Sequence, residues 1–66
     1  MNNIKKSRKK AEMTIRQLSG KSKVAIGYLS DLENDNKRNP SRDTMEKISN
    51  ALSQSVQSIF FPDAKE

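Results

Sequence analysis

The stretch TIRQLSGKSKVAIGYLSDLE, residues 14–33, decides the fold. Thr14 precedes a short helical pattern, and Gln17 follows it by three residues, which is the arrangement of a capping box at a helix start. After a break, a second apolar stripe consists of Val24, Leu29 and Leu32. Two helices this short are unstable alone because nucleation is costly, so they must pack on each other and on a neighbour. The sequence therefore predicts a helix-turn-helix.

Another helix is predicted ahead of this stretch, over about residues 3–11. Ile4, Arg8 and Ala11 recur at helical spacing and share its inner face. The outer face carries Lys5, Lys6, Lys9 and Lys10. We interpret these lysines as a solvated surface, from which at least one side chain could also contact a phosphate.

The two helices of the motif are predicted over about residues 15–21 and 25–34, and two more follow a polar loop. Ser41 is the expected N-cap of the fourth helix, because a serine oxygen accepts from the unpaired backbone N–H groups there. The buried stripe of that helix comprises Met45, Ile48, Ala51 and Leu52. Ser55 is the expected cap of a short fifth helix that Pro62 ends. Its inward side chains are Val56, Ile59 and Phe60.

The length of 66 residues allows one domain with one small core, which we expect over residues 1–61, followed by a short frayed tail over residues 62–66.

The chain has no Cys and no His, which excludes a disulfide scaffold, thiolate or imidazole zinc sites, and the usual nucleophilic dyads. We expect no enzyme activity, metal, cofactor or small-molecule ligand. The longest apolar runs have three residues, so we expect no membrane association and a cytoplasmic location.

Basic residues exceed acidic ones by 13 to 8, which gives a net charge of +5 and a pI near 9.8. Such a charge suits a polyanionic partner. A membrane surface would also attract it, and surplus lysine can simply keep a small protein in solution. Joined to a helix-turn-helix, the charge points to the major groove of double-stranded DNA.

The whole pattern resembles the Cro/CI-type (XRE) helix-turn-helix repressors, a family that includes the lambdoid phage repressors. The resemblance runs from Ile4 to Phe60. Its spacing is carried by Leu18, Val24, Leu29, Leu32, Glu33, the loop Arg38-Asn39-Pro40-Ser41, Ala51-Leu52, Val56 and Ile59. The resemblance implies an all-α, compact five-helix bundle of the lambda-repressor-like DNA-binding type, with the helix-turn-helix in its second and third helices.

Three positions depart from the family pattern. Lys23 stands in the turn where the family usually has Gly, and a left-handed backbone there costs Lys something that Gly avoids. Ile15 stands where the family often has a Gln that reaches a phosphate. Ala25 replaces the Ser or Thr that begins the recognition helix. We therefore expect a turn of the usual shape with altered contact chemistry.

The resemblance also implies an ion pair between Arg8 and Glu33, because related repressors tie these positions together. Arg can hold a carboxylate through two parallel N–H bonds. The alternative is that Arg8 is one more phosphate contact.

The resemblance implies that the third helix lies in the major groove, with its base-facing set being Ala25, Ile26, Gly27, Tyr28 and Asp31. Only two of these side chains can hydrogen-bond. Asp31 could accept from cytosine or be neutralised by a nearby cation, and Tyr28 could bond a phosphate or pack against the second helix. Ala25 and Ile26 can contact thymine methyl groups, Gly27 allows close approach, and Ile26 could instead be a buried or interface residue. We expect weak, apolar base readout.

Much of the affinity should then come from phosphates. The candidates near the second helix and in the loop are Arg16, Gln17, Lys23, Lys37, Arg38 and Arg42. Two copies on a palindromic operator would bind far better than one. We expect a weak homodimer through Phe60 and Phe61, unless Phe61 only covers the core beside Pro62.

The expected function is sequence-specific DNA binding by a transcriptional regulator, most simply a repressor. The alternative is a protein-interaction module of the antitoxin or anti-repressor type, which would use the same surface of the third helix. Apolar Ile26 and Tyr28 would suit such a contact.

Overall fold

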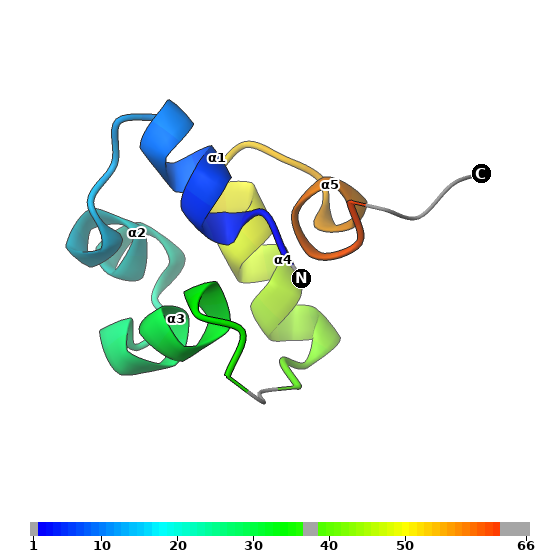
Figure 1. Cartoon of the computed structure of the whole chain (residues 1–66). Coiled ribbons are helices and arrows are strands. Elements are labelled where there is room, and N and C mark those ends of the chain that lie inside the picture. Colours follow the sequence, from blue (N-terminus) through cyan, green and yellow to red (C-terminus); the bar gives the residue numbers. More distant parts are fainter. Residues whose placement is uncertain (1, 37–38, 63–66) are drawn as a thin grey trace.

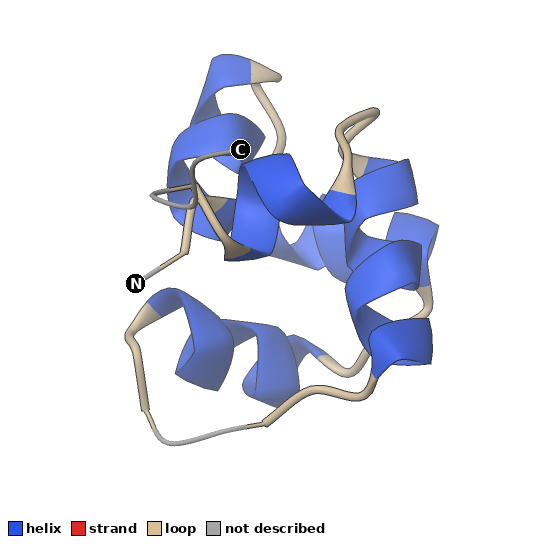
Figure 2. Ribbon diagram, turned by 90° about the vertical axis from the view of Figure 1, so that its right-hand side faces the viewer, coloured by secondary structure: helices blue, strands red, loops and turns tan. Residues whose placement is uncertain are grey.

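The computed structural model describes residues 2–36 and 39–62, and within these ranges the regular structure is entirely helical (Figures 1 and 2). The helices are α1 (Ile4–Lys10), α2 (Ile15–Ser22), α3 (Ile26–Glu33), α4 (Arg42–Ala51) and α5 (Val56–Phe60). The predicted all-α, five-helix bundle is confirmed. None of the helices in the described ranges is both long and apolar enough to cross a membrane.

Every helix sends one completely buried side chain into a common core. These side chains are Ile4, Leu18, Leu29, Ile48 and Ile59. Val24, Leu32, Ala51 and Leu52 complete the core between them. Burying an aliphatic side chain of this size contributes about 1.5–3 kcal/mol, which explains how so polar a chain can fold.

Side-chain caps begin three of the helices, as predicted. At α2, Thr14 Oγ1 accepts from Gln17 N at 3.0 Å and Gln17 Oε1 accepts from Thr14 N at 2.8 Å, which completes the capping box. Ser41 accepts from Thr44 N at the start of α4, and Ser55 accepts from Ser58 N at the start of α5. Each such cap is worth about 1 kcal/mol, so local sequence sets these three helix starts.

Two asparagines before α1 join elements that are distant in the sequence. Asn2 Nδ2 donates to the carbonyl oxygen of Leu32 at 2.8 Å, at the end of α3. The backbone N–H of Asn3 donates to the carbonyl oxygen of Ile59 at 2.7 Å, in α5. The start of the chain therefore closes the bundle between α3 and α5.

The predicted inner faces need two corrections. Ala11 was expected on the inner face of the first helix, but it is exposed because α1 ends one residue earlier, at Lys10. Met45 was expected in the buried stripe of the fourth helix, but it is only half-buried, as are Val56 and Phe60. Side chains at the margin of a core this small remain partly in solvent.

Candidate nucleic-acid interface

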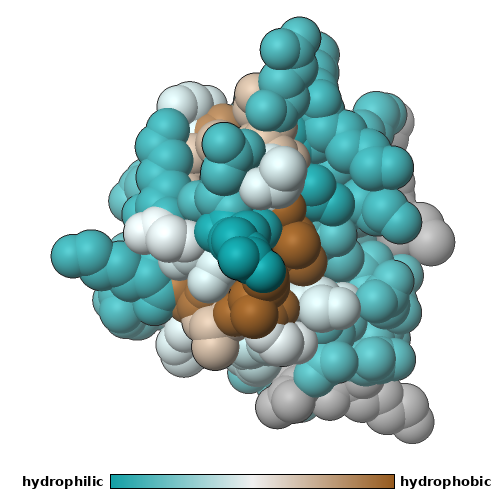
Figure 3. All heavy atoms as spheres, turned by 90° about the vertical axis from the view of Figure 1, so that its left-hand side faces the viewer, coloured by the Kyte–Doolittle hydropathy of each residue, from teal (hydrophilic) through white to brown (hydrophobic). Residues whose placement is uncertain are grey.

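The first turn of α3 lies open on the surface. Ala25 and Gly27 are exposed and Ile26 is 43% exposed, whereas Leu29 and Leu32 on the other face of α3 are buried. Figure 3 views the side of the molecule on which α2 and the N-terminal end of α3 lie, and it shows a hydrophobic patch surrounded by hydrophilic side chains. Ile26 is therefore neither a core residue nor covered by the described part of its own chain.

The other two residues of the expected reading surface are half-buried. Tyr28 packs against the hydrophobic core. Asp31 Oδ1 accepts from Asn36 Nδ2 at 3.2 Å, and Asp31 O accepts from Asn36 N at 3.0 Å. Asp31 thus shapes the loop that leaves α3, a role that the sequence could not show because the pairing depends on the path of the loop.

The start of α3 differs from the starts of α2, α4 and α5. Its N-cap is Ala25, and no side chain caps this end of the helix. The first N–H groups of a helix carry a partial positive charge and favour anions. The N-terminal end of α3 therefore combines exposed apolar side chains with an electropositive backbone.

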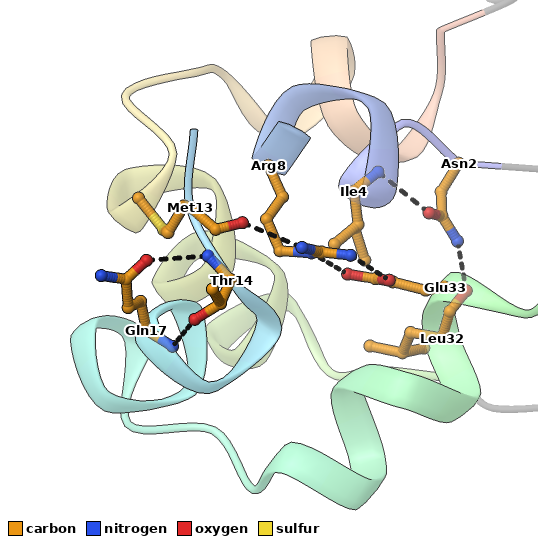
Figure 4. Close-up of polar contacts among 8 residues, drawn as sticks. All are labelled: Asn2, Ile4, Arg8, Met13, Thr14, Gln17, Leu32 and Glu33. Carbon is orange, nitrogen blue, oxygen red and sulfur yellow. Dashed lines mark hydrogen bonds and ion pairs between the residues drawn. The ribbon is translucent and has the colours of Figure 1, made fainter. Parts of the chain in front are cut away.

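An ion pair holds the opposite end of α3 (Figure 4). Arg8 Nε lies 2.7 Å from Glu33 Oε2, and Arg8 Nη2 donates to Glu33 Oε1 at 3.1 Å, so the guanidinium makes two parallel bonds. Arg8 Nη1 also donates to the carbonyl oxygen of Met13 at 2.9 Å. The side chains are only 12% and 5% exposed, which places the pair inside the bundle.

The hydrogen bonds with Glu33 raise the pKa of Arg8 above its ordinary value, although burial acts in the opposite direction. Because the pKa is raised in the folded protein, the charged guanidinium stabilises the fold fully at any pH below the ordinary pKa of arginine. This stabilisation is lost only when the pH rises past the pKa of Arg8 in the folded protein. The contribution of Arg8 is therefore constant across the physiological pH range.

The turn between α2 and α3 consists of residues 23–25. Lys23 adopts the left-handed conformation, with φ 62° and ψ 31°, and its N–H donates to Ser19 O. Ser19 Oγ also donates to the carbonyl oxygen of Val24 at 2.7 Å. Sequence reasoning overlooked Ser19, because a serine inside a helix gives no sign that its hydroxyl will reach the following turn.

Replacing Lys23 with Gly should raise the free energy of unfolding by about 1 kcal/mol, because Gly adopts a positive φ without steric cost. The melting temperature should rise by a few degrees, since about 1 kcal/mol corresponds to roughly 4–8 °C in a domain of this size. Thermal denaturation measures the change. A matched Lys21→Gly variant, inside α2, should instead be destabilised, and equal effects of the two substitutions would contradict the geometric explanation.

Several of the expected phosphate contacts lie near this surface. Arg16, Gln17 and Lys23 are exposed on α2 and the turn. The Oε1 atom of Gln17 is used by the capping box, which leaves its amide N–H₂ group as the donor. Lys21, which was not among the expected contacts, is exposed beside them and lines a groove with Lys23 and Lys47.

Of the three phosphate contacts expected around the loop, Arg42 is the one that the described residues include. Arg42 is exposed at the start of α4, but its Nε lies 3.2 Å from Glu46 Oε2. An exposed pair of this kind is worth little, so a phosphate can compete with Glu46 for the guanidinium. Lys37 and Arg38 lie outside the described residues.

At the far end of the chain, Phe60 is half-buried against the core and Phe61 is 51% exposed. Phe61 and Ile26 are the large hydrophobic side chains that the described residues expose. No group of three acidic side chains in the described part of the chain could hold a metal ion.

Comparison with known proteins assigns the fold to a family. The helix-turn-helix family model matches residues 4–59, which include all but the last residue of the five helices. Neither the curated proteins nor the solved structures give a match to this chain. The matched family consists of DNA-binding regulatory domains and not of enzymes. The chain therefore belongs to the Cro/CI-type (XRE) helix-turn-helix family of DNA-binding transcription regulators.

Proposed function

We propose that this protein is a transcriptional repressor that places the N-terminal turn of α3 in the major groove of an operator. The observation that carries the proposal is the exposure of Ala25, Ile26 and Gly27 on a helix whose other face is buried. The turn fixes one end of this helix and the Arg8–Glu33 pair fixes the other. A rigid helix presented in this way can follow the groove without ordering cost.

Base readout would be mainly apolar. Ala25 and Ile26 offer methyl groups that suit the C5-methyl group of thymine, and neither side chain can donate or accept a hydrogen bond. A Cβ placed at Gly27 would have no neighbouring heavy atom within 4 Å. The helix surface is therefore open at that point, and the edges of base pairs can approach its backbone. We infer a preference for thymine-containing base-pair steps, which would lie next to the electropositive N-terminal end of α3.

Phosphates would then supply most of the affinity. If about six contacts form in a dimeric complex, the logarithm of the association constant should fall against the logarithm of salt concentration with a slope near −5. Mobility shift across a salt series measures this slope. Suitable probes are fragments that the protein itself recovers from a random-sequence pool.

Scrambled fragments of the same length and composition are the control. They should bind more weakly than recovered fragments at every salt concentration, because they keep the phosphates and lose the base contacts. A flat salt dependence, or equal binding of recovered and scrambled fragments, would rule out the proposed site.

We propose that two copies bind a palindromic operator and repress by covering a promoter, in the cytoplasm where the genome lies. The exposed ring of Phe61 supports a weak homodimer through the α5 end. Sedimentation of the protein with a recovered fragment tests this arrangement, and a single copy on the DNA at saturation would contradict it.

A second candidate function uses the same surface to bind a protein, as an antitoxin or anti-repressor would. It is favoured by one observation, the 43% exposure of the apolar Ile26 side chain. The absence of a cap on α3 and the exposed cations of α2 and the turn favour DNA instead. The recovery of fragments with a shared sequence would decide for DNA.

A further inference from the structure

The surplus positive charge of this chain is concentrated on α1, away from the proposed reading surface. Lys5, Lys6, Lys9 and Lys10 are all exposed. Without these four lysines, nine basic residues would face eight acidic ones, and the net charge would fall from +5 to +1. The net positive charge of the chain therefore depends mainly on this one helix face, in addition to the exposed cations Arg16, Lys21 and Lys23 near α3.

Ion pairs neutralise several cations elsewhere in the described chain, but not on this face. Arg8 pairs with Glu33, Arg42 with Glu46, and Lys47 with Asp43. No carboxylate of the described residues forms an ion pair with any of the four α1 lysines. The α1 lysine face, defined as Lys5, Lys6, Lys9 and Lys10, is thus a strongly cationic patch with uncompensated charge.

The helix dipole favours Lys9 and Lys10 in the last turn of α1, but it does not explain Lys5 and Lys6 or the repetition of like charges along this face. Lys5 and Lys9, and likewise Lys6 and Lys10, are like charges at i,i+4, which destabilise a helix. The first turn of α1 carries no acidic residue, so Lys5 and Lys6 also lie unfavourably at the positive end of the helix dipole. A local arrangement that costs stability points to a role outside the fold.

The orientation of α1 directs this face away from α3. Ile4 is buried and Arg8 points toward the C-terminal end of α3, as Figure 4 shows, so Lys6, Lys9 and Lys10 lie on the outer side of the helix, and Lys5, three residues before Arg8, lies at the edge of that side. The reading surface is at the N-terminal end of α3, which is about 10 Å along the axis from Glu33. A duplex under α3 would therefore not be the one that meets these lysines.

We propose that the α1 lysine face binds the phosphate backbone of a second duplex segment, so that one molecule can hold two segments of DNA. The inference rests on the proposed function for the first segment. Lys5 and Lys10 are separated by about 8 Å along the helix axis, which matches two to three phosphates of one strand. The face has neither amide nor aromatic side chains, so its binding is independent of sequence.

A bridging experiment tests this proposal. A recovered fragment is fixed to beads, the protein is added at about 50 mM salt, where phosphate contacts are strong, and the retention of a second, fluorescent duplex of unrelated sequence is measured. The wild-type protein should retain the second duplex. In the variant with all four lysines changed to Gln, the amount of retained duplex should fall about tenfold or more, because this variant loses up to four phosphate contacts.

The same four positions changed to Arg provide the matched control, because this variant keeps the charge and should keep the bridging. The Gln variant should still shift the recovered fragment alone, and its melting temperature should not fall. If the wild-type protein retains no second duplex, or if the Gln variant retains as much as the wild type, the proposal is wrong. In the second case a protein dimer would be holding the two duplexes.

Two further arms separate the alternatives. A wild-type protein that binds polyglutamate through these lysines but retains no second duplex would identify the face as a docking site for an acidic protein and overturn the proposal. A Gly27→Glu variant that shifts the recovered fragment as well as the wild type would contradict the proposed function, while bridging that depends on the lysines would still support the α1 lysine face.

Discussion

Replacing Arg8 with Ala should lower the free energy of unfolding by about 3–5 kcal/mol, because the substitution leaves a buried carboxylate without its partner. Glu33 is only 5% exposed and receives two of the three hydrogen bonds of the guanidinium. The carbonyl oxygen of Met13 loses its donor as well. Thermal denaturation should show a melting temperature lowered by more than about 10 °C, and urea denaturation should show a lower midpoint concentration.

Three variants make this prediction specific. Lys9→Ala removes an exposed cation from the same helix and should change stability by less than about 0.5 kcal/mol. Arg8→Lys keeps the charge but not the two-bond geometry, so it should lie between wild type and Arg8→Ala, and it gives a measurable protein if the alanine variant does not fold. Arg8→Met combined with Glu33→Leu removes both charges and should recover most of the loss. An unchanged melting temperature in Arg8→Ala would show that the pair does not stabilise the fold.

Replacing Gly27 with Glu should reduce affinity for recovered fragments by about 100-fold, since like-charge contact at an interface costs several kcal/mol. The new carboxylate would project from the exposed first turn of α3 toward the duplex. No neighbouring atom lies within 4 Å of a Cβ at this position, so the fold has room for the side chain. The free protein should be at least as stable as the wild type, because Glu favours a helix more than Gly does by about 0.5–1 kcal/mol.

The matched control is Gly20→Glu, at the other glycine of the chain. Gly20 is exposed on α2 and is equally unobstructed, so this variant carries the same change in net charge and in helix propensity. It should keep most of its DNA affinity. Equal losses in the two variants would mean that net charge alone controls binding, which would remove the reading surface from α3.

Local signals in the sequence were enough to predict three of the helix starts and most of the core. Thr14 with Gln17, Ser41 and Ser55 act on their own first turns, and the spacing of Leu18, Leu29 and Ile48 follows from helix geometry. These features involve neighbours in the chain or one face of one helix. The sequence could therefore indicate them without knowledge of the packing.

The remaining features depend on contacts between distant residues. The two-bond pair of Arg8 with Glu33 was inferred from a family resemblance and not from the spacing, and its bond to Met13 was not anticipated. The loop contact of Asp31 with Asn36 also had no sequence signal. The degree of exposure at Met45 and Phe61 is set by the size of the core, which a helical pattern does not report.

Clamping α3 at both ends has an evolutionary consequence. Ala25, Ile26 and Gly27 contribute little to the core, while Leu29, Leu32 and Glu33 behind them carry the packing and the ion pair. In the proposed function, recognition and folding thus depend on separate positions of one short helix. A lineage could change its operator by single substitutions at the outer positions without compensating mutations in the interior. A change in the tilt of α3 is not open to it, because both ends of this helix are fixed.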